Sequence, residues 1–134
     1  MFRKTATLSF AIFATISASA LAQIPASSYP VFFQPWSAGL DANAASTIAI
    51  AAKTAVANPS YPVVVTGSAD TVGSEAANKD LALTRAQVVA DALTADGVAA
   101  SRIAIVSTGS ISSPGVAPGS FAQFSRRVLI QVGN

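Results

Sequence analysis

Short runs of apolar residues, rich in Val, Ile and Phe, predict four β-strands in this chain. The run "YPVVVTG" is short and β-branched, which is typical of a central strand buried on both faces. In "RRVLIQV", alternate positions are apolar, so Val128, Ile130 and Val132 are expected on one buried face. The predicted strands cover residues 30–36, 61–67, 102–109 and 126–132.

Two segments rich in Ala predict helices between these strands. The first lies within residues 37–60, where Asp41 can cap its start and Asn58-Pro59 ends it. The second runs from about Ser74 to Ala95, before Asp96-Gly97. The stripes expected to be buried are Ala45, Ile48, Ala52 and Ala55 on the first helix and Ala77, Leu81, Val88 and Ala92 on the second.

The element order is therefore βαβαββ. It predicts an α/β (α+β) sandwich in which the helices pack on one mixed sheet. The chain of 134 residues has the size of one domain.

The N-terminal segment has the pattern of a secretory signal peptide. Arg3 and Lys4 precede an uncharged run that ends at Ala20-Leu21-Ala22, a cleavage signature of the A-x-A type. We expect cleavage after residue 22, a short, poorly ordered lead over residues 23–29 and one domain over residues 30–134. The alternative is an uncleaved anchor, but the run is diluted by Thr and Ser, and membrane-spanning helices need about 20 strongly apolar residues. No transmembrane segment is expected in the mature chain.

Composition excludes several kinds of chemistry. The chain has no His and no Cys, which removes Ser-His-Asp triads, thiol nucleophiles and Cys/His zinc sites. Eight basic and six acidic residues form no basic patch suited to nucleic acid. We therefore expect no enzyme activity, no cofactor, no metal and no nucleic-acid partner.

The few charges gather in "TGSADTVGSEAANKDLALTRAQ", which holds five of the fourteen charged residues. Asp70 follows a predicted strand, a position that ligand sites in α/β folds favour. Asn78 and Arg85 lie about two helical turns apart, so they point the same way, and the small Ala82 leaves room between them. Such a cleft suits a zwitterion, with a ligand ammonium on Asp70 and a ligand carboxylate on Arg85. Alternatively, Asp70 and Arg85 pair with each other, and the other three charges are solvated.

This segment resembles the centre of the OmpA-like (OmpA/MotB C-terminal) domain family. The family pattern, G-H-T-D, then G-S, then N-x-x-L-S-x-x-R-A, then V-x-x-x-L and a Gly, appears here as "GSAD", "GS", "NKDLALTRA", "VVADAL" and Gly97. "VFFQPWSAGL", "RIAIVSTG" and "RRVLIQV" resemble the opening, third and closing strands. The similarity covers residues 30–132.

The resemblance implies a non-catalytic module that binds the diaminopimelate stem peptide of peptidoglycan. It implies a periplasmic location, associated with the cell wall or the outer membrane. It also implies that Asp70 and Arg85 hold the amino-acid end of diaminopimelate and that Asn78 supports the site. Arg126 and Arg127 match an Arg pair of which one member faces the cleft; the alternative is a solvated start of the last strand.

The sequence departs from the family pattern around this cleft, where polar residues are lost. Phe121 and Phe124 are expected in the core, whereas Trp36 could line the cleft or fill the core. A second hypothesis is therefore a degenerate domain that binds envelope proteins through apolar surface near Trp36. A wall hydrolase is the weakest hypothesis, since no acid/base couple is evident. The departures are Ser68 and Ala69 for His-Thr, Ala82 for Ser, Ser125 for Asn and Trp36 for Asp or Asn.

Overall fold

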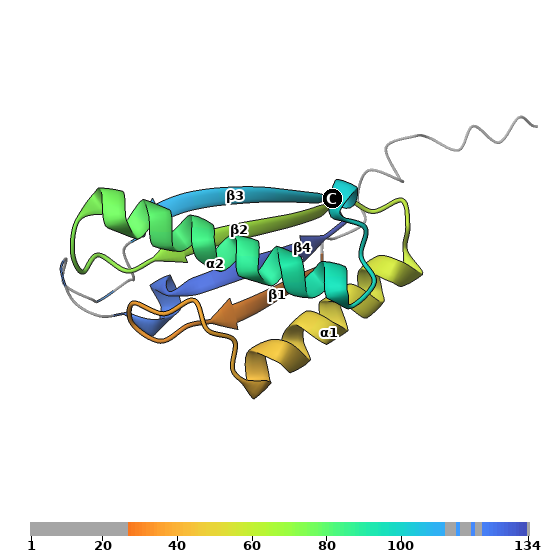
Figure 1. Cartoon of the computed structure of the whole chain (residues 1–134), viewed down its shortest axis with the longest axis horizontal. Helices are drawn as coiled ribbons and strands as arrows, with labels where there is room; N and C mark the ends of the chain where they lie inside the picture. The colour runs from red at the N-terminus through yellow and green to blue at the C-terminus, as the bar shows by residue number, and fades with distance from the viewer. Residues whose placement is uncertain (1–26, 112–114, 116–118, 120–121, 134) are drawn as a thin grey trace, which may run out of the picture.

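The computed structural model describes residues 27–111, 115, 119 and 122–133 of the chain. The order of its strands and α-helices confirms the βαβαββ prediction (Figure 1). Two short 3-10 turns, η2 (Ala100–Arg102) and η3 (Gln123–Ser125), precede the last two strands. The elements are β1 (Ser27–Phe32), α1 (Ala42–Ala57), β2 (Val63–Ala69), α2 (Glu75–Ala95), β3 (Ile103–Ser110) and β4 (Arg127–Val132).

The four strands form one mixed sheet with the order β1-β4-β2-β3. Strands β2 and β3 are parallel, and β4 runs antiparallel to both β1 and β2. Helix α2 packs on β2 and β3, while α1 packs on β1 and β4. Both helices lie along the same face of the sheet (Figure 1). The predicted α+β sandwich is therefore confirmed.

The core lies between this sheet face and the helices. Val128, Ile130 and Val132 of β4 are almost completely buried, as their alternation predicts. The prediction that β2 is buried on both faces is wrong. Val63 and Val65 are fully buried, but Val64 and Thr66 are only partly buried, because the two helices cover a single face.

Both helices begin at the predicted caps. Asp41 Oδ1 accepts a hydrogen bond from the amide of Ala44 at 2.7 Å, and Ser74 Oγ accepts one from the amide of Ala77 at 3.1 Å. Helix α1 buries Ala44, Ile48, Ala51, Ala52 and Ala55. Burial of Ile48, Ala52 and Ala55 is as predicted, whereas the predicted burial of Ala45 is wrong.

The stripe predicted for α2 is wrong by about one position. Ala77 is exposed, and the other three predicted residues are only partly buried. The buried face includes Asn78 and Arg85, polar residues that a search for apolar spacing passes over. The buried residues of α2 are Asn78, Ala82, Arg85, Ala86, Val89, Ala90 and Leu93.

Strand β1 begins at Ser27, inside the segment expected to be a poorly ordered lead. It pairs along its whole length with β4, from Ser27 opposite Val132 to Phe32 opposite Arg127. The Tyr29 hydroxyl also lies 2.7 Å from Thr54 Oγ1 on α1. Pro30 is tolerated because β1 is an edge strand. The predicted signal segment and most of the predicted loop 110–120 lie outside the described residues.

Gly67 allows α2 to approach β2 closely. A Cβ at this position would lie 1.9 Å from the carbonyl oxygen of Ala82. Any larger residue would therefore push the helix away from the strand. The close approach brings Arg85, on the next turn of α2, to the end of β2.

Candidate functional site

Asp70 lies directly after β2 and is almost completely buried. Its Oδ1 accepts a hydrogen bond from the amide of Val72 at 3.1 Å. Its Oδ2 accepts one from the amide of Ala122 at 3.4 Å and one from Nη1 of Arg126 at 3.2 Å. The carboxylate is thus fixed by its own loop and by the approach to β4.

Arg126 connects Asp70 to the end of β1. Its Nε donates to the carbonyl oxygen of Phe33 at 3.0 Å, while Nη1 forms the ion pair with Asp70. The two side chains of this pair are 11% and 7% exposed. A pair this buried holds its geometry firmly, because losing either partner would leave a charge away from water.

Arg85 is completely buried on the inner face of α2. Its hydrogen bonds to described residues all end on backbone carbonyl oxygens. Nε donates to Ser37 at 2.8 Å, Nη2 to Gln34 at 3.0 Å and Nη1 to Ser68 at 3.2 Å. The guanidinium also lies 5.2 Å from the centre of the Phe33 ring.

Burial lowers the pKa of Arg85 from its ordinary value to about 10; nearby Asp70 opposes this change, and Arg126 adds to it. The side chain therefore stays cationic at neutral pH. Asp70, Arg85 and Arg126 together carry one negative and two positive charges. This cluster thus has one positive charge in excess, which favours an anionic ligand group.

Asn78 lies on the same face of α2 as Arg85, as their spacing predicts. Its Nδ2 donates to the carbonyl oxygen of Val72 at 2.9 Å. This bond ties the helix to the loop that follows Asp70. The alternative in which Asp70 pairs with Arg85 is not what the structure shows, since the ion pair of Asp70 is with Arg126.

Arg127 lies apart from the other predicted site residues. Its side chain stacks on Phe124, with the guanidinium 4.1 Å from the ring centre, and Nη1 donates to the carbonyl oxygen of Phe124 at 3.3 Å. It lines a hollow on the other face of the sheet with residues of β2 and β4. The core placement expected for Phe124 is wrong, since it is 53% exposed. Phe121 lies outside the described residues.

Ser68 and Ser125, two of the departures from the family pattern, are buried and connect the strands that carry the site. Ser68 Oγ donates to the carbonyl oxygen of Ser125 at 2.8 Å. The Ser68 carbonyl in turn accepts from Arg85. Sequence reasoning missed these contacts, because they depend on backbone atoms that every residue type carries.

Trp36 lies in the turn Gln34–Ser37, whose Gln34 and Ser37 carbonyl groups accept hydrogen bonds from Arg85. Among the described residues, Trp36 is the non-glycine residue whose φ is positive, at 54°. The residue is 53% exposed. Its ring approaches Gly73 so closely that a Cβ there would lie 2.4 Å from Cη2 of the indole. Trp36 therefore lies at the surface beside the Asp70 loop and does not fill the core.

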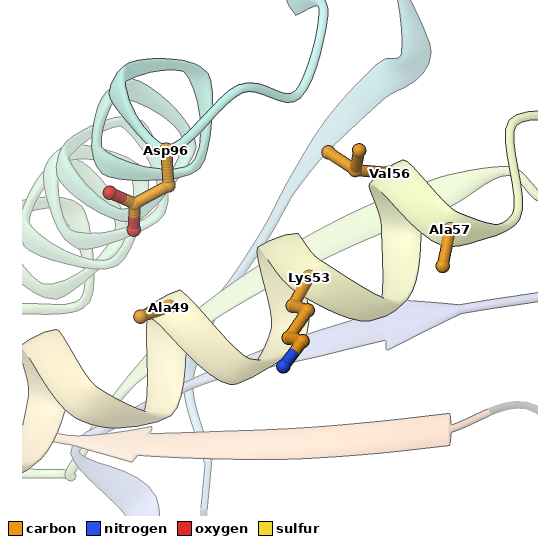
Figure 2. Close-up of a pocket in the computed structure, with 5 residues that line it drawn as sticks. All are labelled: Ala49, Lys53, Val56, Ala57 and Asp96. Carbon is orange, nitrogen blue, oxygen red and sulfur yellow. The ribbon is translucent and has the colours of Figure 1, made fainter.

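A separate hollow of about 500 Å³ lies between α1 and the end of α2, away from this ionic cluster. Figure 2 shows its lining, which is mostly short and apolar. The amino group of Lys53 points away from α2, and the carboxylate of Asp96 does not face it (Figure 2). Polar groups do not converge here, so this hollow lacks the usual features of a ligand site.

The described residues contain no group of three or more acidic, His or Cys side chains able to hold a metal ion. In the same part of the chain, no helix combines the length and apolarity needed to cross a bilayer. The fold and the site define a small α+β domain with a buried ionic cluster at the end of a central strand.

The chain belongs to the OmpA family, whose model matches residues 32–123. This confirms the predicted resemblance. No curated protein sequence matches the chain at a significant level.

Solved structures of OmpA-like domains share the fold. The OmpA-like domain of FopA1 from Francisella tularensis is 24% identical, with a TM-score of 0.70 over 78% of this chain and 70% of that one. The peptidoglycan-associated lipoprotein from Burkholderia pseudomallei is 25% identical, with a TM-score of 0.69 over 77% and 89%. The C-terminal domain of Helicobacter pylori MotB is 23% identical, with a TM-score of 0.62 over 78% and 84%.

Proposed function

We propose that this protein is a non-catalytic, periplasmic module that binds the diaminopimelate stem peptide of peptidoglycan. The excess positive charge of the cluster formed by Asp70, Arg85 and Arg126 carries the proposal. Membership of the OmpA family supports it, and so does the similarity to a lipoprotein named for its association with peptidoglycan. The signal-like N-terminal segment agrees with a location in the envelope, near the cell wall or the outer membrane.

In this proposal the two ends of the zwitterion go to different residues. The ligand carboxylate binds Arg85, whose two parallel donors, Nε and Nη2, now bond neutral carbonyl groups, and which lacks an anionic partner among the described residues. The ligand ammonium binds Asp70, whose carboxylate Arg126 and two backbone amides hold in place. Asn78 fixes the loop between them. Arg127 has no part in the cleft, because it lies on the other face of the sheet.

Sedimentation with purified diaminopimelate-type peptidoglycan tests the proposal. We expect the wild-type protein to pellet, and Asp70→Ala to bind at least about 25-fold more weakly, since removing one partner of a buried charge pair costs about 2–5 kcal/mol. Arg127→Ala is the matched control, because it removes a neighbouring guanidinium outside the cleft. A folded Asp70→Ala protein that pellets like wild type would show that the cleft is assigned wrongly.

A second candidate function is a protein-binding module in the envelope. Trp36 and Phe124, each 53% exposed, are the observations that favour it. In that case Trp36→Ala would abolish binding of the partner protein, whereas Asp70→Ala would leave this binding unchanged. Crosslinking in intact cells followed by mass spectrometry distinguishes the two functions.

A further inference from the structure

Two carbonyl oxygens occupy the edge of Arg85 that a carboxylate would use. Nε and Nη2 lie on the same edge of a guanidinium and form the fork that binds a carboxylate with two parallel hydrogen bonds. Here Nε donates to Ser37 at 2.8 Å, and Nη2 donates to Gln34 at 3.0 Å. The two carbonyl groups thus stand where the two oxygens of a carboxylate would lie, but they bring no negative charge.

Both carbonyl groups belong to one tight turn, Gln34–Ser37. The amide of Ser37 donates to the carbonyl oxygen of Gln34 at 3.2 Å, which closes the turn. Pro35 takes its second position, and Trp36, with φ of 54°, takes its third. Turns with positive φ at the third position ordinarily have Gly or Asn there, and a bulky residue in this conformation is strained.

The turn is held in place from two sides. On one side, Arg85 of α2 donates hydrogen bonds to the two carbonyl groups of the turn. On the other, the indole of Trp36 lies against Gly73 in the loop after Asp70. Gly73 has no side chain to block this contact. The turn therefore covers Arg85 and adjoins Asp70, the two residues proposed to bind the ends of the ligand.

We infer that this turn is an internal substitute for the ligand carboxylate and that Trp36 sets how readily it is displaced. The inference rests on the proposed function for the identity of the ligand. On binding, the two carboxylate oxygens replace the Gln34 and Ser37 carbonyls on Nε and Nη2, and the turn moves away. The exchange is favourable because a carboxylate adds a full negative charge beside a buried guanidinium whose present partners are neutral carbonyl groups, and this attraction is strong where water is excluded. Release of the strained φ of Trp36 adds to it.

Two substitutions separate backbone strain from loss of the indole. Trp36→Ala and Trp36→Gly both remove the ring, but only Ala keeps a side chain that disfavours positive φ. If the turn opens on binding, the Ala variant should bind a diaminopimelate muropeptide about fivefold more tightly than the Gly variant, equivalent to ~1 kcal/mol. In the free protein, the Gly variant should be the more stable of the two.

Isothermal calorimetry measures the affinities, and urea unfolding measures the stabilities. Equal affinities of the two variants, with saturable binding by wild type, would overturn the exchange and leave the proposed function intact. Equal stabilities would likewise show that the turn stores no strain. If wild type fails to bind the muropeptide at all, the proposed function fails, and the exchange fails with it.

Trp36 is the single tryptophan of the chain, so its fluorescence reports on the turn directly. We expect its emission to change on saturation with the diaminopimelate muropeptide, because the indole leaves Gly73. Asp70→Ala at the same ligand concentration is the control for unbound ligand. Unchanged emission at concentrations where calorimetry shows full binding would mean that the turn stays closed.

Discussion

Oδ2 of Asp70 accepts a hydrogen bond from Nη1 of Arg126 at 3.2 Å, although Arg85 is also close enough for the charge of Asp70 to raise its pKa. The carboxylate is therefore neutralised by Arg126, which directly precedes β4, and Arg85 is left with neutral carbonyl partners. This division of partners makes Arg126 a residue that holds the site together. It leaves Arg85 as the cation that a ligand carboxylate can neutralise.

Removing either partner of the buried Asp70–Arg126 pair should destabilise the fold strongly. Asp70→Ala or Arg126→Ala should each lower the free energy of unfolding by about 3–5 kcal/mol, because each leaves a buried charge without its partner. The double variant should lose less than the sum of the two. Urea unfolding of the four proteins measures this coupling.

Arg127→Ala is the control for Arg126→Ala. Its stacking on Phe124 lies near the surface, so its loss should cost about 1 kcal/mol or less. If the two Arg variants proved equally destabilised, the burial assigned to the Asp70–Arg126 pair would be wrong.

Helix α2 should be sensitive to truncation at Leu93 and tolerant at Leu83. Leu93 is fully buried, whereas Leu83 is 39% exposed on the same helix. Leu93→Ala should lower the free energy of unfolding by about 2–5 kcal/mol, since it leaves a cavity in the core. Leu83→Ala should change it by about 1 kcal/mol or less. Thermal unfolding followed by circular dichroism checks both, and a larger loss for Leu83→Ala would contradict the observed orientation of α2.

Regular patterns in the sequence were enough to predict the fold. The alternation of Val128, Ile130 and Val132 fixed the buried face of β4, and Asp41 and Ser74 marked the helix starts. Each of these signals is local, because side-chain type and spacing alone produce it.

The interior of the site could not be predicted in the same way. Asn78 and Arg85 can be buried because they donate to backbone carbonyl oxygens. Every residue type carries such an oxygen, so the sequence does not show where these acceptors lie. The choice of Arg126 over Arg85 as the partner of Asp70 depends on how β4 approaches β2. The apolar stripe of α2 was misplaced for the same reason, since two of its buried residues are polar.

Ligand binding should be insensitive to pH around neutrality and should weaken in strong base. The chain has no His, and burial lowers the pKa of Arg85 only to about 10, so Arg85 stays charged. The affinity should be nearly constant between about pH 6 and about pH 9 and should fall as Arg85 loses its proton above that range. Calorimetry across this range checks it, and a several-fold change near neutrality would implicate a different group.

The same pKa gives the sign of a stability effect. The folded pKa of Arg85 is about 10, below the value for an unperturbed side chain, so the unfolded chain binds more protons in the window between about pH 10 and that unperturbed value. The contribution of Arg85 to stability should therefore rise with pH through this window. Comparison with Arg85→Met, which has no such proton, isolates the effect from other titrating groups. A contribution that falls over this window would contradict the lowered pKa.

The site should distinguish stem peptides by the distal end of their third residue. Diaminopimelate ends in an ammonium and a carboxylate, lysine has the ammonium alone, and amidated diaminopimelate carries a neutral amide. Arg85 would lack an anionic partner with the last two ligands, and a single amide oxygen cannot replace both the Gln34 and Ser37 carbonyls. We expect both to bind at least about tenfold more weakly, since a hydrogen bond to a charged group contributes about 1.5–3 kcal/mol.

Calorimetry with the three muropeptides measures this preference, and Arg85→Met serves as the matched variant. It keeps an unbranched side chain that reaches about as far as Nε but has no guanidinium, so its affinities for the three ligands should converge. Equal binding of the lysine and diaminopimelate forms by wild type would show that Arg85 does not receive the ligand carboxylate. In that case, the excess positive charge beside Asp70 would have to attract a different anionic group.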